Sequence, residues 1–230
     1  MPDGDAFVHL WSIPMPGAGP EVRHSLLRVP AADDGTPVAD SLLEWDVEVA
    51  SPDPMAELKL VQAQPVWAVG TGPVIWWTPG DPYELRRFTS GGHLERIVEV
   101  PGDGVQLDDA LRSKIKAYML RLQSPGSGGY SVMSGMLDRA IWPESLPRVA
   151  RLWVSDSRGR VFAARYDEGL FDDPLHMRID VFEPDGSYEG RLDLPGGFTP
   201  RRFVQGAVYG VARDELDVSY AVRYQLLEPE

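Results

Sequence analysis

The sequence contains no cysteine and no asparagine, and it is poor in basic residues. Without cysteine there can be no disulfide framework, no thiolate zinc or iron-sulfur site and no thiol nucleophile. The 22 Lys and Arg residues against 35 Asp and Glu give a formal net charge of -13. Nucleic-acid binding needs clustered cations that neutralise phosphates, and anionic lipid repels an acidic protein. Neither partner is therefore expected.

Long hydrophobic runs are also missing. No segment approaches the roughly 18 apolar residues that a membrane-spanning helix needs. The first five residues, MPDGD, lack the basic and apolar regions of a signal peptide, and the compartment is left open. A hydrophobic fraction of 43% in 230 residues is enough for a packed core, so we expect a folded, soluble chain.

Glycine and proline are abundant, at 23 and 21 residues, and they separate short segments of alternating polarity. Residues 83–102 align with residues 177–196 at a constant offset of 94 (177 − 83). Phe88 then meets Phe182, and Gly92 meets Gly186. Each copy reads as strand, tight turn and strand, so the sequence predicts one hairpin that occurs twice.

A second hairpin precedes each copy, in residues 65–78 with Trp67 and in residues 151–166 with Trp153. The two hairpins together predict a four-stranded antiparallel unit, and three-stranded units flank the two complete ones. The predicted order is a partial blade at about 6–50, a blade at about 58–102, a helical insertion at about 103–147, a blade at about 148–196 and a partial blade at about 199–227. We expect these parts to form one domain, residues 1–230.

Tandem four-stranded antiparallel units are typical of β-propeller blades. The segments WAVG (67–70) and PDGSYEGRLDLPGGFTPRRF (184–203) resemble the later blades of uncharacterised bacterial six-bladed β-propeller proteins of NHL-repeat-like architecture. The resemblance covers about residues 20–227 and implies a fold but no activity. It also implies a family whose members are often exported.

Six blades of roughly 40–45 residues would need more residues than this chain has. We therefore expect an all-β chain that forms the C-terminal blades of a partial six-bladed propeller. Its open sheet edges would pair with the missing blades or with a second copy.

Residues 103–147 break the strand pattern. Leu107, Leu111, Ile115, Tyr118 and Leu122 recur at helical spacing and predict an amphipathic helix. Residues 124–129, SPGSGG, are interpreted as a flexible linker, and residues 134–141 as a short second helix that ends before Pro143.

In a propeller blade, the loop between the second and third strands lies on the same face as the crossover to the next blade. The insertion and the long loop 166–176 should therefore rise from one rim, where binding sites are common. The candidate binding residues on or near this rim are Asp81, Trp142, Asp167, Asp172, Asp173, His176 and Asp214. The alternative is that an acidic protein simply carries solvated acidic loops on both faces.

Other chemistry has little support in the sequence. The four histidines are scattered without metal-ligand spacing, and no calcium loop, phosphate loop or nucleophile elbow occurs. An S-x-x-K match would need K-T-G and S-D-N partners that the chain lacks. Trp67, Trp76 and Trp153 are predicted to pack between blades, whereas Trp142 would fix the insertion to the rim.

These observations predict a non-enzymatic binding or interaction module that meets a protein or small-molecule ligand at the rim. No catalytic residue and no cofactor is assigned. The first alternative is a propeller enzyme of lactonase, lyase or hydrolase type that depends on a divalent cation such as Ca²⁺. The absence of asparagine, a common ligand in such sites, argues against it. The second alternative is a purely structural propeller fragment.

Overall fold

The computed structural model describes residues 6–12, 21–29, 40–48, 59–70, 74–123, 127–155, 158–172, 175–214 and 218–226. Each sheet is antiparallel and is made from consecutive strands. The first contains β1 (Ala6–Ser12), β2 (Glu21–Val29) and β3 (Asp40–Glu48). The second contains β4 (Val66–Val69), β5 (Ile75–Thr78), β6 (Glu84–Phe88) and β7 (Leu94–Glu99). The third contains β8 (Val149–Val154), β9 (Val161–Arg165), β10 (Arg178–Phe182) and β11 (Tyr188–Asp193). The fourth contains β12 (Thr199–Val204), β13 (Ala207–Arg213) and β14 (Ser219–Gln225).

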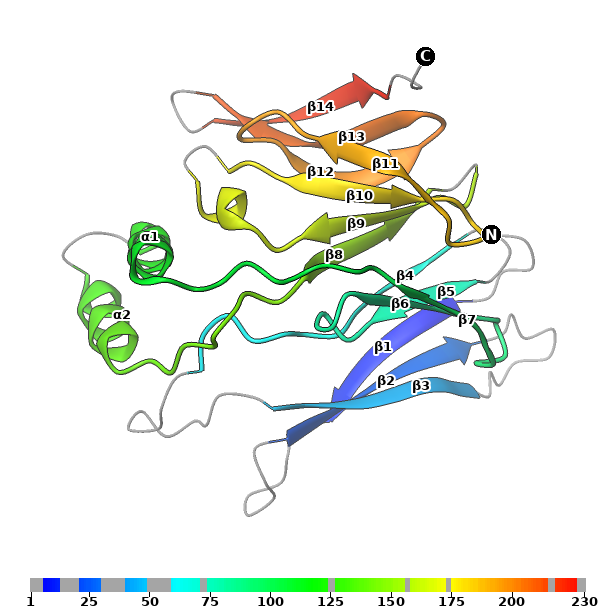
Figure 1. The fold of residues 1–230 in the computed structure, drawn as a ribbon, viewed down its shortest axis with the longest axis horizontal. Helices are drawn as coiled ribbons and strands as arrows, with labels where there is room; N and C mark the ends of the chain where they lie inside the picture. The colour runs from blue at the N-terminus through cyan, green and yellow to red at the C-terminus, as the bar shows by residue number, and fades with distance from the viewer. Residues whose placement is uncertain are drawn as a thin grey trace.

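The four sheets stack face to face in chain order, from β1–β3 at one end to β12–β14 at the other (Figure 1). Strand β8 contacts both β4 and β12, so the first strands of neighbouring sheets lie side by side. This is the arrangement of β-propeller blades. The predicted fold class, all-β with four-stranded antiparallel blades and a helical insertion, is confirmed.

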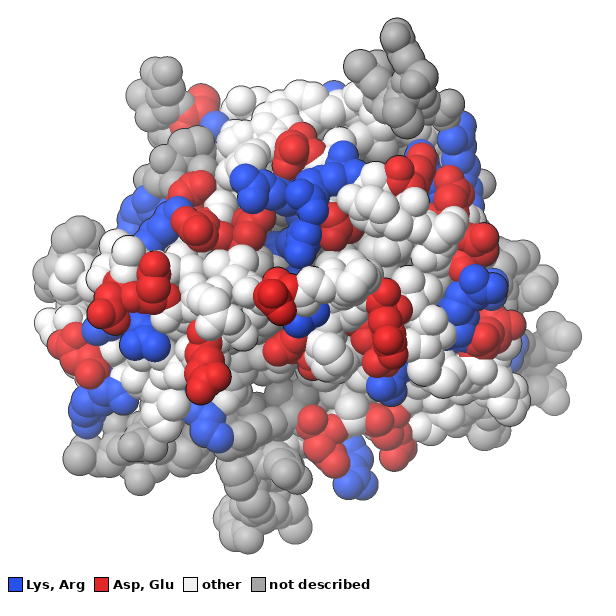
Figure 2. Space-filling model, in the orientation of Figure 1, with Lys and Arg blue, Asp and Glu red and all other residues white. Residues whose placement is uncertain are grey.

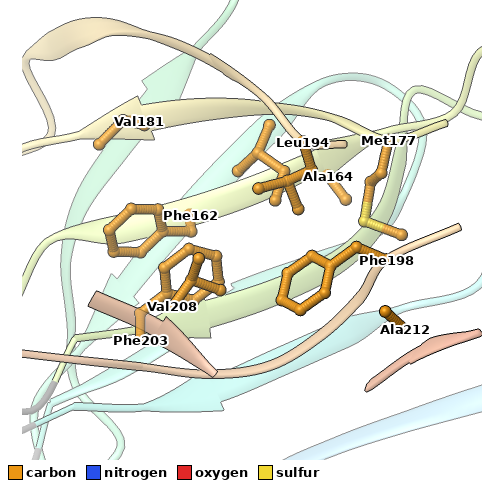
Figure 3. Packing of buried hydrophobic residues seen from close by; sticks show 10 residues of the cluster. Phe162, Ala164, Met177, Val181, Leu194, Phe198, Phe203, Val208 and Ala212 are labelled. Atoms are coloured by element: carbon orange, nitrogen blue, oxygen red, sulfur yellow. The ribbon is translucent and has the colours of Figure 1, made fainter. Parts of the chain in front are cut away.

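The core lies between the sheets. Between the third and fourth sheets, the rings of Phe162 and Phe203 stack with centroids 3.9 Å apart (Figure 3). Ile179 and Val208, both 0% exposed, belong to the same cluster. Side chains alternate along each strand, so each inner sheet buries one set against each neighbour.

The adjacent residues Trp76 and Trp77 show this alternation. Trp76 packs toward the third sheet beside Leu85 and Phe182, whereas Trp77 packs toward the first sheet beside Leu26. Trp67 and Trp153 are half-buried and also pack between sheets. The predicted structural role of Trp67, Trp76 and Trp153 is confirmed.

The two copies of the repeated hairpin have the same backbone details. Gly92 and Gly186 occupy the two turns with φ of 76° and 87°, where a side chain would be strained. The register shifts between Arg87 and Phe88 in one copy and between Val181 and Phe182 in the other. These bulges stand 94 residues apart (182 − 88), so the repeat extends to an irregularity that the alternating pattern does not reveal.

The insertion contains the helix α1 (Asp109–Arg121), as predicted, and the helix α2 (Gly128–Asp138). The second helix begins earlier than residue 134 and ends earlier than residue 141. Gly128 and Gly129 belong to it because the Ser127 side chain accepts a hydrogen bond from the Tyr130 backbone nitrogen, at 3.1 Å. The Ser-Gly-Gly sequence is thus a helix start, whereas we expected a linker.

Candidate binding site at the rim

The rim is defined here as the side of the stack, at the ends of the strands, where the insertion and the β9–β10 loop lie (Figure 1). That loop contains the short helix η2 (Glu168–Phe171), which contacts α1. Leu111 and Ile115 of α1 pack with Phe171 of η2 in a cluster of their own. The predicted meeting of the insertion and the 166–176 loop on one rim is confirmed.

Several acidic side chains at the rim accept hydrogen bonds from backbone N–H groups. Asp108 accepts a hydrogen bond of 2.8 Å from the Leu111 nitrogen and caps α1. Asp167 accepts one of 2.9 Å from the Gly169 nitrogen and caps η2. Asp214 accepts one of 2.9 Å from the Val218 nitrogen in the β13–β14 turn. Capping satisfies donors that would otherwise be orphaned, which is why these loops are rich in Asp.

Of the remaining candidate residues, Asp172 and His176 lie close together, because the backbone nitrogens of both donate to the Gly169 carbonyl. The exposed Asp81 lies 3.6 Å from Arg148, and Asp172 forms an ion pair of 2.5 Å with Lys114 of α1. His176 is half-buried, and its backbone nitrogen donates to the Gly169 carbonyl. Trp142 is half-buried against the insertion cluster, as expected for an anchor. Asp173 lies outside the described residues.

The rim also contains a cavity of about 210 Å³ that the sequence did not predict. It lies where the start and end of the insertion, the end of β9 and the strands β10 and β11 meet. We call it the arginine cleft, because four arginines line it. Its lining residues are Asp103, Gly104, Val105, Pro147, Arg148, Arg165, Tyr166, Asp167, Arg178 and Arg191. Figure 2 shows basic side chains gathered over the third sheet, with acidic side chains around them.

The strand pleat explains why three of these arginines point the same way. Asp180 pairs with Ala163 on β9 and with Arg191 on β11, and cross-strand partners share a face. Arg165 and Arg178 lie two residues from Ala163 and Asp180, so they occupy that face as well. It is the face that packs toward the second sheet, beside Tyr83.

Asp180 lies on the same face as these arginines and is buried, with 1% of its surface exposed. One of its carboxylate oxygens accepts a hydrogen bond of 3.0 Å from the Tyr83 hydroxyl, and the other accepts one of 3.2 Å from Arg191 Nε. Arg165 Nε lies 3.7 Å away, and its guanidinium lies over the Tyr83 ring. A buried carboxylate with these partners is compensated, so it has a structural role.

The network changes the acidity of two partners of Asp180. Burial, followed by the charge of Asp180, raises the pKa of Tyr83 well above its ordinary value of 10.0. The hydrogen bond to Asp180 raises the pKa of Arg191. Tyr83 therefore stays a neutral donor and Arg191 stays a cation at any physiological pH.

Within the described part of the chain, no three His, Asp or Glu side chains gather in the way that metal ligands do. None of the helices described is long and apolar enough to cross a membrane.

Comparison with known proteins gives only distant similarities. No family model and no curated protein matches the sequence. Among solved structures, selenomethionine-substituted virginiamycin B lyase from Staphylococcus aureus is 12% identical, with a TM-score of 0.34, over 91% of this chain and 53% of that one. A streptogramin B lyase is 13% identical, with a TM-score of 0.33, over 96% of this chain and 59% of that one. The chain thus spans less than two thirds of either structure, and TM-scores this low carry no argument.

Proposed function

We propose that this chain is a non-enzymatic binding module that takes its ligand at the rim. The observation that carries the proposal is the arginine cleft itself. The insertion is held on the blades by its own buried cluster, and the beginning and end of that insertion form one wall of the cleft. Elaborated segments on a rigid sheet scaffold are where binding sites usually occur.

The test is a screen of small fragments of mixed charge, with binding located by backbone amide chemical shifts. We expect the shifts to cluster at residues 103–105, 147–148 and 165–167 and to spare the turns on the opposite side, at 89–93 and 183–187.

Asp103→Asn should change the affinity of rim ligands, because this exposed carboxylate lines the cleft. The matched control is Asp185→Asn in the opposite turn, which removes the same charge. Hits spread evenly over the surface, or confined to the opposite side, would contradict the proposal.

A calcium titration followed by thermal unfolding distinguishes a cation-dependent enzyme from a non-enzymatic binding module. A cation that binds only the folded state raises the melting temperature by linkage. We expect no shift at millimolar calcium. A rise that saturates would instead favour a cation-dependent propeller enzyme and would overturn the non-enzymatic assignment.

We also propose that the whole chain is a single propeller domain belonging to a six-bladed, NHL-like ring. The three-stranded sheets at the two ends of the stack, compared with the four-stranded sheets between them, support this proposal. Their open edges would pair with further blades or with a second copy. Light scattering after size-exclusion chromatography tests the second case, since a lone chain has a mass of 25.5 kDa and a pair has twice that mass.

A further inference from the structure

Building on the proposed rim function, we infer that the arginine cleft binds a small oxyanion, a carboxylate or a phosphate, through Arg148, Arg165 and Arg178. The four arginines of the cleft are drawn from the end of the insertion and from β9, β10 and β11. Guanidinium groups match carboxylate and phosphate oxygens with paired N–H donors, which is the geometry that such a ligand needs.

Three of these guanidiniums have donors to spare. Among the described residues, the Arg148, Arg165 and Arg178 side chains form ion pairs of 3.6 or 3.7 Å, which are too long for hydrogen bonds, and Arg165 also lies over the Tyr83 ring. Arg191, in contrast, is committed to Asp180 at 3.2 Å. Half of the Arg178 side chain is exposed, at 50%, whereas Arg148 and Arg165 are more sheltered at 24% and 32%. A ligand would therefore meet cations that are partly desolvated, where charge-assisted hydrogen bonds are strongest.

The acidic side chains near the cleft accept no hydrogen bonds from Arg148, Arg165 or Arg178. Asp167 is 8% exposed, and its Oδ2 accepts no hydrogen bond although Arg178 Nη1 lies 3.7 Å away. Asp180 is already bonded to Tyr83 and Arg191. The cleft is lined by four arginines and two aspartates, Asp103 and Asp167, so the lining itself has an excess of two positive charges (4 − 2) in a protein of net charge −13. Three further carboxylates, of Asp81, Asp180 and Asp193, contact the same arginines from outside the lining.

The volume and the charge together limit the ligand. At about 210 Å³ the cavity is smaller than the roughly 300–1,000 Å³ of pockets that take drug-sized molecules. The acidic surface around it repels a polyanion whose charges come within a Debye length of it, about 8 Å at physiological salt. Both features favour a compact anion with one or two charges over a polymer or a large cofactor.

The experiment is isothermal titration of the full chain with acetate, succinate and inorganic phosphate, with methylammonium as a cationic control. We expect at least one of the three anions to bind and methylammonium not to bind. Preference among the anions distinguishes the carboxylate source from the phosphate source. Arg178→Gln should weaken binding by ~10-fold, and Arg178→Lys by less, since one charge-assisted bond has roughly that value. Raising the salt concentration should weaken binding further.

The matched control is Arg202→Gln on the exposed side of β12, which removes the same charge in a different sheet and should leave the affinity unchanged. Equal loss in both variants would show a general charge effect and overturn the inference. So would binding that persists in an Arg148→Gln/Arg178→Gln double variant whose melting temperature matches the parent. If fragments bind the rim but no anion competes with them, this inference fails and the proposed function survives. If no ligand of any charge reaches the rim, both fail.

Discussion

The Tyr83 hydroxyl, just before β6, donates a hydrogen bond of 3.0 Å to Asp180 on β10 and so joins two neighbouring blades. Both groups are almost completely buried, with 2% and 1% of their surface exposed. The contact connects a residue of one hairpin copy to a residue of the other. It therefore couples the packing of the second and third sheets to Arg165 and Arg191, which contact Asp180 and line the arginine cleft.

The first prediction concerns alkaline pH. The pKa of Tyr83 is raised by burial above its ordinary value of 10.0, so the folded state keeps a proton that the unfolded state loses above pH 10. The stability from this group is complete below pH 10 and falls as the pH rises, by at most about 1.4 kcal/mol per pH unit. Urea unfolding at pH 9, 10 and 11 should show a shallower decline for Tyr83→Phe than for the parent. Parallel declines would mean that Tyr83 ionises equally in both states.

The second prediction concerns Asp180, the buried carboxylate that contacts two arginines of the cleft. Asp180→Asn removes the charge that compensates Arg191 and Arg165, and we expect the free energy of unfolding to fall by about 1–3 kcal/mol. Asp193→Asn is the control, because that carboxylate is 62% exposed and lies 3.7 Å from Arg178. Exposed pairs contribute little, so the control should lose less than about 1 kcal/mol. Similar losses in chemical denaturation would show that burial of Asp180 has no special weight.

The third prediction concerns close packing at the last sheet. A methyl group at Gly210 would meet the Thr199 carbonyl oxygen and would lie 2.5 Å from the Phe198 ring. Because backbone and a buried ring cannot easily move, Gly210→Ala should destabilise the fold by about 1–3 kcal/mol. Gly135 on α2 has no atom within 4 Å of the same methyl group, so Gly135→Ala should be neutral or stabilising by up to about 1 kcal/mol. Thermal melts of the two variants should move in opposite directions or differ clearly in size.

The fourth prediction concerns the insertion. Asp108 caps α1 through the Leu111 nitrogen, and Asp108→Ala should destabilise the helix by about 1 kcal/mol. Asp109→Ala removes the same charge from the first turn but leaves the cap intact, so its effect should be smaller. Hydrogen exchange of the α1 amides measures both. Faster exchange confined to α1 in Asp108→Ala would confirm that the insertion opens separately from the blades. Unchanged α1 exchange in that variant would contradict the prediction.

Much of the fold was predictable because its signals are local. Alternating side chains, turn glycines such as Gly92 and Gly186, and the helical spacing around Leu111 and Ile115 each act within a few residues. The start of α2 was missed because Ser-Gly-Gly is ambiguous until the Ser127 side chain is seen to cap Tyr130.

The cleft was not predicted because its arginines are contributed by separate strands and follow no spacing motif. The available signal was weaker. Asp180 lies at an inward position of β10, between the buried Ile179 and Val181, and a charge there indicates a partnered site. The acidic residues that the sequence did single out are spread among caps and ion pairs.

The repeat also shows how two blades with the same backbone pattern can differ in charge. At the offset of 94, Arg178 and Asp180 correspond to Glu84 and Arg86 (178 − 94 and 180 − 94). Glu84 and Arg86 form an ion pair with each other, whereas Arg178 and Asp180 pair with other residues. The two hairpins thus present the same pair of backbone positions with the signs of charge reversed. The third strand begins with a cation, Arg178, in one blade and with an anion, Glu84, in the other. The charge at the start of this strand is therefore set by individual side chains and not by the fold.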